Sequence, residues 1–250
     1  MGDEVHVWKV SLSVPDEAAA RLAGVLNREE TSRAERFHFT RDQRRYTLSR
    51  AALRIILSRH LHCCPRELVF GYGAYGKPYL TGLPAGHDVR FNLSHCQDLT
   101  LIAVSPTRNL GIDVEKVRDI TAAPDIAEQY YSVEERQFVQ AASSASRHAA
   151  FAMIWTRREA TAKALGLNLA TALSGLTIPV FEHGEVARID GTHVPRVPSG
   201  GFVPRRTGGS GAQWFLQDLS LDPGHAGAIC VEGSPCPVVL QDFEAAAAVP

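Results

Sequence analysis

Two acidic residues in the segment GIDVEK are the first candidates for chemistry in this sequence. Asp113 and Glu115 stand two positions apart in an apolar stretch with strand character. Because side chains alternate between the faces of a β-strand, we expect both carboxylates on the same face. A hard divalent cation that takes oxygen ligands, such as Mg²⁺, would relieve their repulsion. A solvated strand end explains the same spacing, so the pair by itself leaves both interpretations open.

A third carboxylate and a lysine follow in the segment WTRREATAKALG. Glu159 and Lys163 are four residues apart, which places them on the same face of a helix. An ordinary helix-surface ion pair also accounts for this spacing. If the helix packs against the strand of Asp113 and Glu115, three carboxylates and one ammonium converge. Such a set suits Mg²⁺ bound to a pyrophosphate, with Lys163 neutralising charge on the leaving group.

Candidate phosphate-binding groups precede these carboxylates in the chain. YGKPYL places Lys77 in a Gly-Pro turn, where we expect a mobile ammonium. FNLSH places Ser94 and His95 at a strand end with donors for an anion. One or two arginines near a long predicted helix could clamp a phosphate monoester; the candidates are Arg33, Arg36, Arg41, Arg44 and Arg45. A plain turn, a structural histidine and solvated arginines are the alternative interpretation.

Hydrophobic periodicity predicts the elements of the first half. We expect a strand over Val5 to Val14, a helix within Asp16 to Ser32, and a long helix from about Asp42 to Leu61. Thr40 and Gln43 form a capping box ahead of the long helix. Three strand candidates follow: LVFGYG, RFNLSH and LTLIAVSP.

In the second half, LGIDVEKV is expected as a strand and a helical region follows it. Ser132 and Glu135 form a capping box, and the WTRREATAKALG helix is expected to stop at Gly166. The later strand candidates are LTIPVFEH, EVARID, QWFLQDLSL and GAICVEG, interrupted by the Gly-rich loop PSGGFVPRRTGGSG. The tail EAAAAVP is expected to fray. Both halves thus combine strands and helices, which predicts two α+β lobes meeting near Leu110 to Lys116.

Composition narrows the possible partners. The chain has 250 residues, 45% of them hydrophobic, which suffices for one large domain or two smaller lobes. Its formal net charge of −1 gives a field too weak for a duplex nucleic-acid binder. No stretch approaches the ~18 apolar residues of a membrane span, and no signal-peptide pattern opens the chain. We therefore expect a cytoplasmic protein without a nucleic-acid or membrane partner, whose cysteines are reduced thiols.

Taken in order, the motifs resemble those of the 4′-phosphopantetheinyl transferases of the large, monomeric Sfp type. The resemblance runs from about Arg28 to Val231. Each motif is only moderately specific alone, but all of them in the family's order and approximate spacing are highly specific. The motifs are RAERF at 33–37, YGKP at 75–78, FNLSH at 91–95, GIDVEK at 111–116 and WTRREATAKALG at 155–166.

The resemblance implies a reaction and a fold. The phosphopantetheine arm of coenzyme A is moved to a serine of an apo acyl or peptidyl carrier protein, and adenosine 3′,5′-bisphosphate is released. The fold implied is α+β, with two similar lobes related by a pseudo-two-fold, each a small antiparallel sheet packed with helices. Residues 1–112 would form the adenine and 3′-phosphate side, and residues 113–250 would carry the magnesium site and the catalytic helix. The implied protein is a monomer serving fatty-acid, polyketide or nonribosomal peptide synthesis.

The resemblance also implies site residues. Asp113, Glu115 and Glu159 would coordinate magnesium together with the coenzyme A pyrophosphate. Glu159 and Lys163 would be catalytic: Glu159 draws the proton from the attacking serine, directly or through water, and Lys163 supports the departing bisphosphate. The implied coenzyme A contacts are Arg33, Arg45, Gly76, Lys77, Pro78, Ser94, His95, Asp113 and Lys163.

The sequence departs from the family pattern at three positions. Asn168 stands where the family usually has Gly, and because Asn tolerates a left-handed backbone we expect the turn to be preserved. Arg158 stands where the family usually has Lys, and Glu30 aligns with a position that is commonly Lys, so the 3′-phosphate clamp is incomplete. One alternative is a different magnesium-dependent transferase acting on a nucleotide or pyrophosphate, although Walker and Rossmann motifs are absent from the sequence. The other is an inactive paralogue that binds coenzyme A or a carrier protein, for which Arg158 is the only support.

Overall fold

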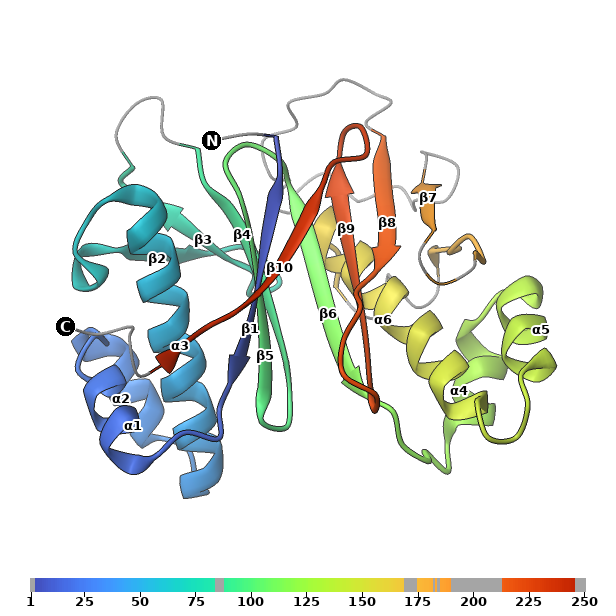
Figure 1. Cartoon of the computed structure of the whole chain (residues 1–250), viewed down its shortest axis with the longest axis horizontal. Coiled ribbons are helices and arrows are strands. Elements are labelled where there is room, and N and C mark those ends of the chain that lie inside the picture. Colours follow the sequence, from blue (N-terminus) through green and yellow to red (C-terminus); the bar gives the residue numbers. More distant parts are fainter. Residues whose placement is uncertain are drawn as a thin grey trace.

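The computed structural model describes residues 3–83, 88–168, 175–181, 183, 185–189 and 213–245. In this part of the chain, each half contains a four-stranded sheet with helices, and a two-stranded sheet lies in the first half (Figure 1). The predicted α+β class is therefore confirmed. None of the helices in the described ranges is long and apolar enough to cross a membrane.

The first half is built from one sheet, a short hairpin and three α-helices. The main sheet has the strand order β10-β1-β5-β4, in which β10 (Val238–Asp242) comes from the end of the chain. The elements are β1 Val5–Ser11, α1 Asp16–Ala23, α2 Arg28–Glu35, α3 Thr40–Leu61, the 3₁₀ helix η1 Pro65–Glu67, β2 Val69–Tyr72, β3 Pro78–Thr81, β4 Arg90–Cys96 and β5 Leu99–Ser105.

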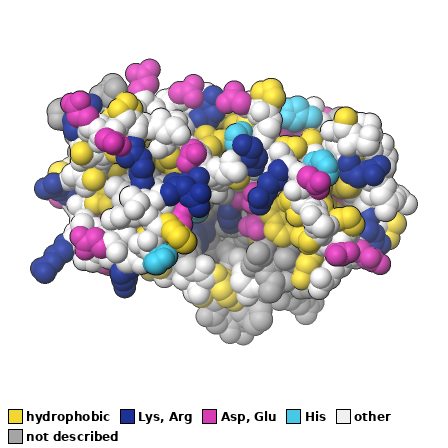
Figure 2. All heavy atoms as spheres, turned by 90° about the horizontal axis from the view of Figure 1, so that it is seen from below, with side chains coloured by type: hydrophobic (Ala, Val, Ile, Leu, Met, Phe, Trp, Pro, Cys, Tyr) yellow, Lys and Arg dark blue, Asp and Glu magenta, His cyan; other side chains and the backbone are white. Residues whose placement is uncertain are grey.

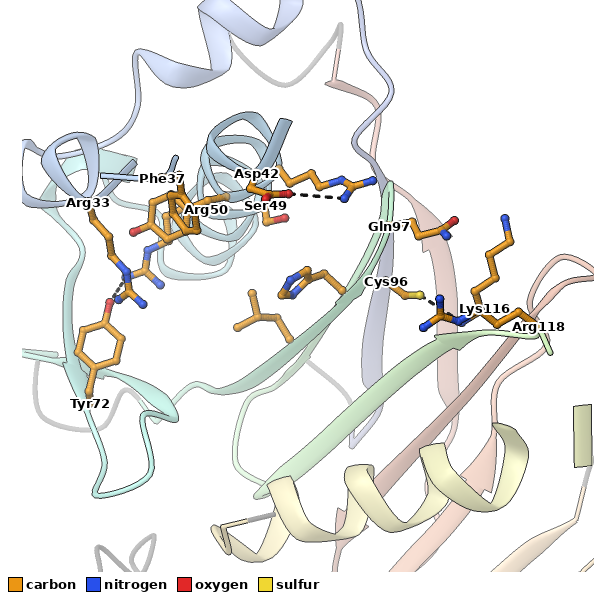
Figure 3. A pocket seen from close by; sticks show the side chains of 14 residues that line it. Arg33, Phe37, Asp42, Ser49, Arg50, Tyr72, Cys96, Gln97, Lys116 and Arg118 are labelled. Carbon is orange, nitrogen blue, oxygen red and sulfur yellow. Dashed lines mark hydrogen bonds and ion pairs between the residues drawn. The ribbon is translucent and has the colours of Figure 1, made fainter. Parts of the chain in front are cut away.

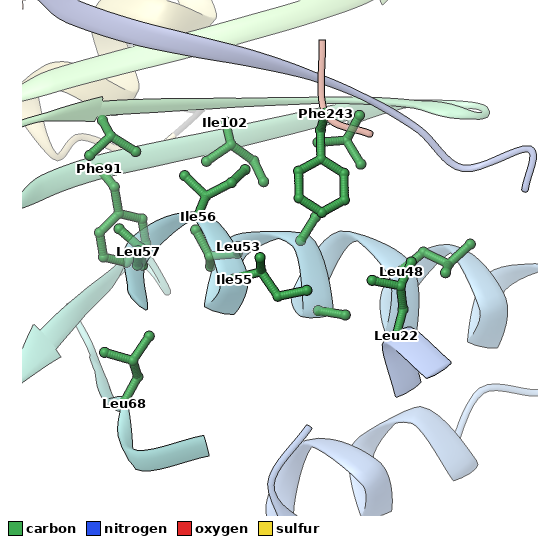
Figure 4. Close-up of a cluster of buried hydrophobic side chains, with 14 of the residues drawn as sticks. Leu22, Leu48, Leu53, Ile55, Ile56, Leu57, Leu68, Phe91, Ile102 and Phe243 are labelled. Carbon is green, nitrogen blue, oxygen red and sulfur yellow. The ribbon is translucent and has the colours of Figure 1, made fainter. Parts of the chain in front are cut away.

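The middle of α3 supplies the core of the first half. Leu53 and Ile56 are fully buried and pack with Ile102 of β5 and with Phe243, which follows β10 (Figure 4). Full burial of each such side chain contributes about 1.5–3 kcal/mol. The long helix is thus fixed on the sheet by its apolar middle, while its first turns remain available to line a cavity.

The helix expected within residues 16–32 is confirmed as α1. A second helix, α2, begins in the same stretch, because Gly24 ends the first and Asn27 caps the second in a capping box with Glu30. The box expected at the start of α3 is absent, since Phe39 is the N-cap and Thr40 is already helical.

The second half repeats the combination of a sheet with helices. Its sheet has the order β6-β9-β8-β7. The elements are β6 Leu110–Lys116, α4 Ala123–Tyr130, α5 Val133–Ala141, α6 Arg147–Leu165, β7 Val186–Ile189, β8 Trp214–Asp218, β9 His225–Glu232 and β10 Val238–Asp242.

Local signals in the second half are mostly confirmed. Ser132 and Glu135 form the expected capping box at α5, and Gly166 ends α6 with φ +68°. The prediction of a strand in LTIPVFEH is wrong, since residues 176–180 form neither helix nor strand. The loop PSGGFVPRRTGGSG and the tail from residue 246 lie outside the described residues.

Strand β10 departs from the division into residues 1–112 and 113–250. It pairs in parallel with β1, with Val7 opposite Leu240, and so belongs to the sheet of the first half. Figure 1 shows β10 crossing back from the second sheet to the first. The boundary near residue 112 stays a prediction, but the last strand does not belong to the expected second lobe.

Helix α6 lies directly against β6. A Cβ atom on Gly111 would lie 2.2 Å from the carbonyl oxygen of Ala160 and 2.2 Å from the amide nitrogen of Ala164. Only glycine permits so close an approach of helix and strand backbones. The helix that carries Glu159 therefore packs on the strand that carries Asp113 and Glu115, as convergence of the three carboxylates requires.

Candidate functional site

Asp113, Lys163 and Ser94 meet where β6, α6 and β4 come together. Lys163 Nζ lies 2.6 Å from Asp113 Oδ1 and 3.1 Å from Ser94 Oγ. Ser94 Oγ in turn donates to Asp113 Oδ1 at 2.7 Å. Asp113 is only 3% exposed. Ser94, expected as a phosphate contact, therefore has its hydroxyl engaged by these two residues.

Two further carboxylates face this group. Glu159 Oε2 lies 4.0 Å from Lys163 Nζ. Burial, followed by the negative charge of Asp113, raises the pKa of Glu159 to about 7. Burial and the Asp113 charge also raise the pKa of Glu115, whose Oε2 accepts a hydrogen bond from Cys96 Sγ at 3.7 Å. Mutual repulsion of the three carboxylates is the condition that a bound cation relieves.

The donor set fits a hard cation that also binds phosphate. Asp113 Oδ1 is engaged by Ser94 and Lys163, but Oδ2 is buried and has no hydrogen-bond partner. Within the described ranges, no three His, Cys, Asp or Glu side chains are close enough to hold a metal unaided. Mg²⁺ commonly uses one or two carboxylates plus phosphate oxygens. The three-ligand set of Asp113, Glu115 and Glu159 stays a prediction.

A cationic cavity of about 630 Å³ adjoins this cluster (Figure 3). In the space-filling view, Lys and Arg side chains gather around a hollow near the middle of one face, beside acidic side chains (Figure 2). Such a cavity suits a phosphate monoester. Its basic lining residues are Arg33, Arg45, Arg50, His95, Lys116 and Arg118.

His95 connects the cavity to the acidic cluster. It follows Ser94 on β4, and burial, followed by the positive charges of Lys163 and Arg45, holds the pKa of His95 below its ordinary value. A neutral imidazole at pH 7 still donates a hydrogen bond to an anion. Arg45 Nε lies 3.0 Å from Asp98, a carboxylate that is half exposed, so this arginine is positioned without being buried. The structure brings Arg33, Arg45 and His95 into one cavity, and their contacts with coenzyme A stay predictions.

Arg50 is a cavity residue that the sequence did not indicate. Its guanidinium lies over the Phe70 ring at 3.9 Å, donates to the Tyr72 hydroxyl at 3.1 Å, and pairs with Glu30. Glu30 also pairs with Arg54, and it is 4% exposed. The carboxylate at the position where the family commonly has Lys therefore orients Arg50 toward the cavity. The sequence feature that could have indicated this role is the presence of two arginines, Arg50 and Arg54, within the apolar stretch of α3.

Lys77 contradicts the expectation of a mobile ammonium. Its Nζ donates to the carbonyl oxygens of Leu110 at 2.8 Å and Lys163 at 2.6 Å. Gly76, at φ +79°, and Pro78 line a smaller cavity of about 220 Å³ together with Lys163. Contacts of residues 76 to 78 with coenzyme A stay predictions.

Arg158 is a structural residue. Its Nη1 lies 2.8 Å from both carboxylate oxygens of Glu135, and both side chains are almost fully buried. The pair links α6 to α5, because Glu135 is also the capping-box residue of α5. The presence of Arg158 where the family usually has Lys therefore gives no support to the interpretation that this chain is an inactive paralogue.

Fold and site together define an α+β protein in which an acidic cluster adjoins a cationic pocket. Comparisons with known proteins give the family. Residues 109–229 match the 4′-phosphopantetheinyl transferase superfamily, and residues 14–107 match the family described as 4′-phosphopantetheinyl transferase, N-terminal. The chain belongs to the Sfp-type 4′-phosphopantetheinyl transferases. Its activity is transfer of 4′-phosphopantetheine to carrier proteins.

Individual relatives agree with this assignment. The 4′-phosphopantetheinyl transferase HetI of a Nostoc species is 36% identical over 170 residues, which cover 68% of this chain and 72% of the relative. The 4′-phosphopantetheinyl transferase psf-1 of Bacillus pumilus is 29% identical over 233 residues, covering 90% of this chain and 89% of the relative. The second match extends the likeness over both halves of the chain.

Proposed function

We propose that Asp113, Glu115, Glu159 and Lys163 form the reacting centre and that transfer requires Mg²⁺. The observation that carries this proposal is the state of Asp113: one oxygen is held by Ser94 and Lys163, and the other is buried without a partner. An orphaned buried carboxylate oxygen is costly unless a ligand satisfies it. When bound, Mg²⁺ would neutralise the charge of the pyrophosphate oxygens.

Coenzyme A is proposed to lie across the two halves. Its 3′-phosphate would enter the cationic cavity and contact Arg33, Arg45, Arg50 and His95. Gly76 and Pro78 would lie on the adenine side. His95 lines the cavity, and its neighbour Ser94 contacts Lys163, so a pyrophosphate next to the bound 3′-phosphate end would lie toward Lys163.

The residues of the chain would act by position and charge. The carrier serine oxygen attacks the phosphorus that carries the pantetheine arm, and the bond from this phosphorus to the oxygen of adenosine 3′,5′-bisphosphate breaks. Glu159 accepts the serine proton, directly or through water. Lys163 stabilises the negative charge that builds on the departing bisphosphate. No nucleophile of the enzyme itself is needed, because the partner supplies it.

Mass spectrometry of an apo carrier protein tests the metal requirement. Purified chain, coenzyme A and Mg²⁺ should yield a carrier heavier by one phosphopantetheine group. EDTA should stop the reaction, and excess Mg²⁺ should restore it. A carrier with its acceptor serine replaced by alanine is the control. Undiminished transfer in EDTA would refute the metal requirement, whereas no transfer to any of several carriers would oppose the assigned activity.

We also propose that the enzyme acts as a cytoplasmic monomer. One chain contributes every residue of the proposed centre, from β6 and α6. All five cysteines are free, as is usual in a reducing compartment. Gel filtration tests the monomer. A panel of fatty-acid, polyketide and peptide-synthetase carriers, compared by kcat/KM, tests which of these pathways the enzyme serves.

A further inference from the structure

The ammonium of Lys77 joins two elements of the second half from a position in the first. Lys77 precedes β3, and its Nζ donates to Leu110 O, at the start of β6, and to Lys163 O, in the last turn of α6. Both acceptors are main-chain atoms, so side-chain rotation cannot remove them. The contact fixes backbone positions.

The Leu110 contact belongs to a row of three along one edge of β6. On its other edge β6 pairs with β9, but toward β4 it has no strand pairing. Side chains of the first half satisfy this edge instead: Asn92 Oδ1 accepts from Ile112 N at 2.9 Å, and Cys96 Sγ accepts from Lys116 N at 3.1 Å. The third contact is the hydrogen bond that Lys77 Nζ donates to the carbonyl oxygen of Leu110. Unsatisfied buried main-chain groups would otherwise destabilise this edge.

The Lys163 contact holds the end of the helix that carries the reacting residues. The last carbonyls of an α-helix lack regular intrahelical partners and carry partial negative charge. Lys163 O accepts from Gly166 N at 3.3 Å and from Lys77 Nζ at the shorter distance of 2.6 Å. Burial lowers the pKa of Lys77 to about 8, so its ammonium is still protonated at pH 7 and donates there. From the same turn, the Lys163 side chain reaches Asp113 at 2.6 Å. Movement of this turn would change that distance directly.

The cationic cavity does not include Lys77. Its basic side chains come from α2, α3, β4, the end of β6 and the segment after β6, and Lys77 instead borders two smaller cavities of about 80 and 220 Å³. Two main-chain carbonyls accept from its ammonium, which leaves one of the three donors. A phosphate contact would have to use that donor without displacing the ammonium from the two carbonyls.

We propose that Lys77 is a positioning residue, which holds the last turn of α6 against the start of β6 so that Lys163 and Glu159 face Asp113. It does not bind a phosphate of coenzyme A. This inference rests on the proposed reacting centre, and it extends that centre by a residue that acts through the backbone.

A split between kcat and KM separates positioning from binding. Lys77→Met keeps the length of the side chain and removes its donors. We expect kcat for carrier modification to fall about 10- to 100-fold, because small misplacements of reacting groups are costly. The KM for coenzyme A should stay within about twofold. A raised KM with unchanged kcat, or both constants unchanged, would overturn the proposal.

Lys9→Met is the matched control. Lys9 pairs with Asp242, whose side chain is 75% exposed, between β1 and β10. A surface pair of this kind contributes about 0–1 kcal/mol. Its loss should leave kcat and KM unchanged.

Lysine-selective labelling tests the proposal in the wild-type protein, even if Lys77→Met does not fold. The chain has only four lysines, so ¹⁵Nζ spectra are assigned with Lys9→Met, Lys116→Met and Lys163→Met variants. Coenzyme A with Mg²⁺ should shift the Lys163 signal and leave that of Lys77 in place. A Lys77 shift as large as that of Lys163 would refute the proposal. Full activity of Asp113→Asn would refute the reacting centre but would not alter the Lys77 spectrum.

Discussion

Ser94 Oγ donates a hydrogen bond of 2.7 Å to Asp113 Oδ1 across two strands that share no backbone pairing. The contact joins the sheet of the first half to the sheet of the second. Lys163 Nζ contacts both partners, so helix α6 is included in the same junction. The FNLSH motif therefore supports the acidic cluster through Ser94, while the next residue, His95, faces the cationic cavity.

Removing the charge of Asp113 should abolish turnover. Asp113→Asn keeps an acceptor oxygen for Ser94 and Lys163 but removes the negative charge proposed to hold Mg²⁺. We expect kcat/KM for carrier modification to fall about 100-fold or more. Circular dichroism and cooperative thermal unfolding should remain. Asp242→Asn, at an exposed carboxylate, is the control. Activity within about threefold of wild type would rule out this role for Asp113.

Arg45 should discriminate coenzyme A from dephospho-coenzyme A, which lacks the 3′-phosphate. A hydrogen bond to a charged group contributes about 1.5–3 kcal/mol, so Arg45→Met should raise the dissociation constant for coenzyme A about 10- to 100-fold. The constant for dephospho-coenzyme A should hardly change. Calorimetry measures both. Arg59→Met, an exposed arginine at the other end of α3, is the control. An equal loss for both ligands would place the 3′-phosphate elsewhere.

The local parts of this structure were predictable, and the long-range contacts were not. Ser132 and Glu135 signal their capping box within four residues, and the helical spacing of Glu159 and Lys163 follows from the period of α6. Lys77 finds its acceptors 33 and 86 residues away, at Leu110 and Lys163. No periodicity in a sequence reports such a contact.

The burial of charged side chains was hardest to predict from the sequence. Arg50 and Arg54 interrupt an apolar pattern and suggest a solvated face, yet both are buried because Glu30, 20 and 24 residues earlier, neutralises them. Strand β10 was missed for another reason: PVVLQD is short, and its partner β1 lies at the opposite end of the chain. The site's composition was therefore visible in the sequence, but its supporting contacts required the fold.

Glu30 should make stability depend on pH in the acid range. Burial raises the pKa of its carboxyl, but hydrogen bonds from Arg54 and the charge of Arg50 outweigh this effect and hold the pKa below its ordinary value. The unfolded chain then binds more protons than the folded one near pH 4. The contribution is complete above the unfolded pKa and is lost as pH falls through the folded pKa.

Glu30→Gln tests this dependence. At pH 7 it leaves Arg50 and Arg54 buried without their carboxylate, which should cost about 3–5 kcal/mol in the free energy of unfolding. Urea unfolding in a series from pH 7 to pH 3 should show the difference from wild type narrowing as the solution becomes acidic. Glu29→Gln, at the exposed neighbouring position, should show no such trend. A difference that is constant with pH would contradict the assigned ion pairs.

Gly111 should be essential for both stability and rate, because it sets the distance between α6 and β6. In Gly111→Ala the new Cβ would meet Ala160 O and Ala164 N at 2.2 Å, and backbone atoms cannot rotate away. Overpacking of this kind costs about 1–3 kcal/mol, measured as the free energy of urea unfolding. The helix must also move outward, which separates Lys163 from Asp113 and should lower kcat about 10-fold or more. Gly24→Ala is the matched control, since Gly24 has an ordinary φ of −61°, ends α1, and would place its new Cβ 3.1 Å from Arg21 O, well beyond the 2.2 Å found at Gly111. A Gly111→Ala protein with wild-type stability and kcat would show that the close approach of helix and strand does not position the reacting residues.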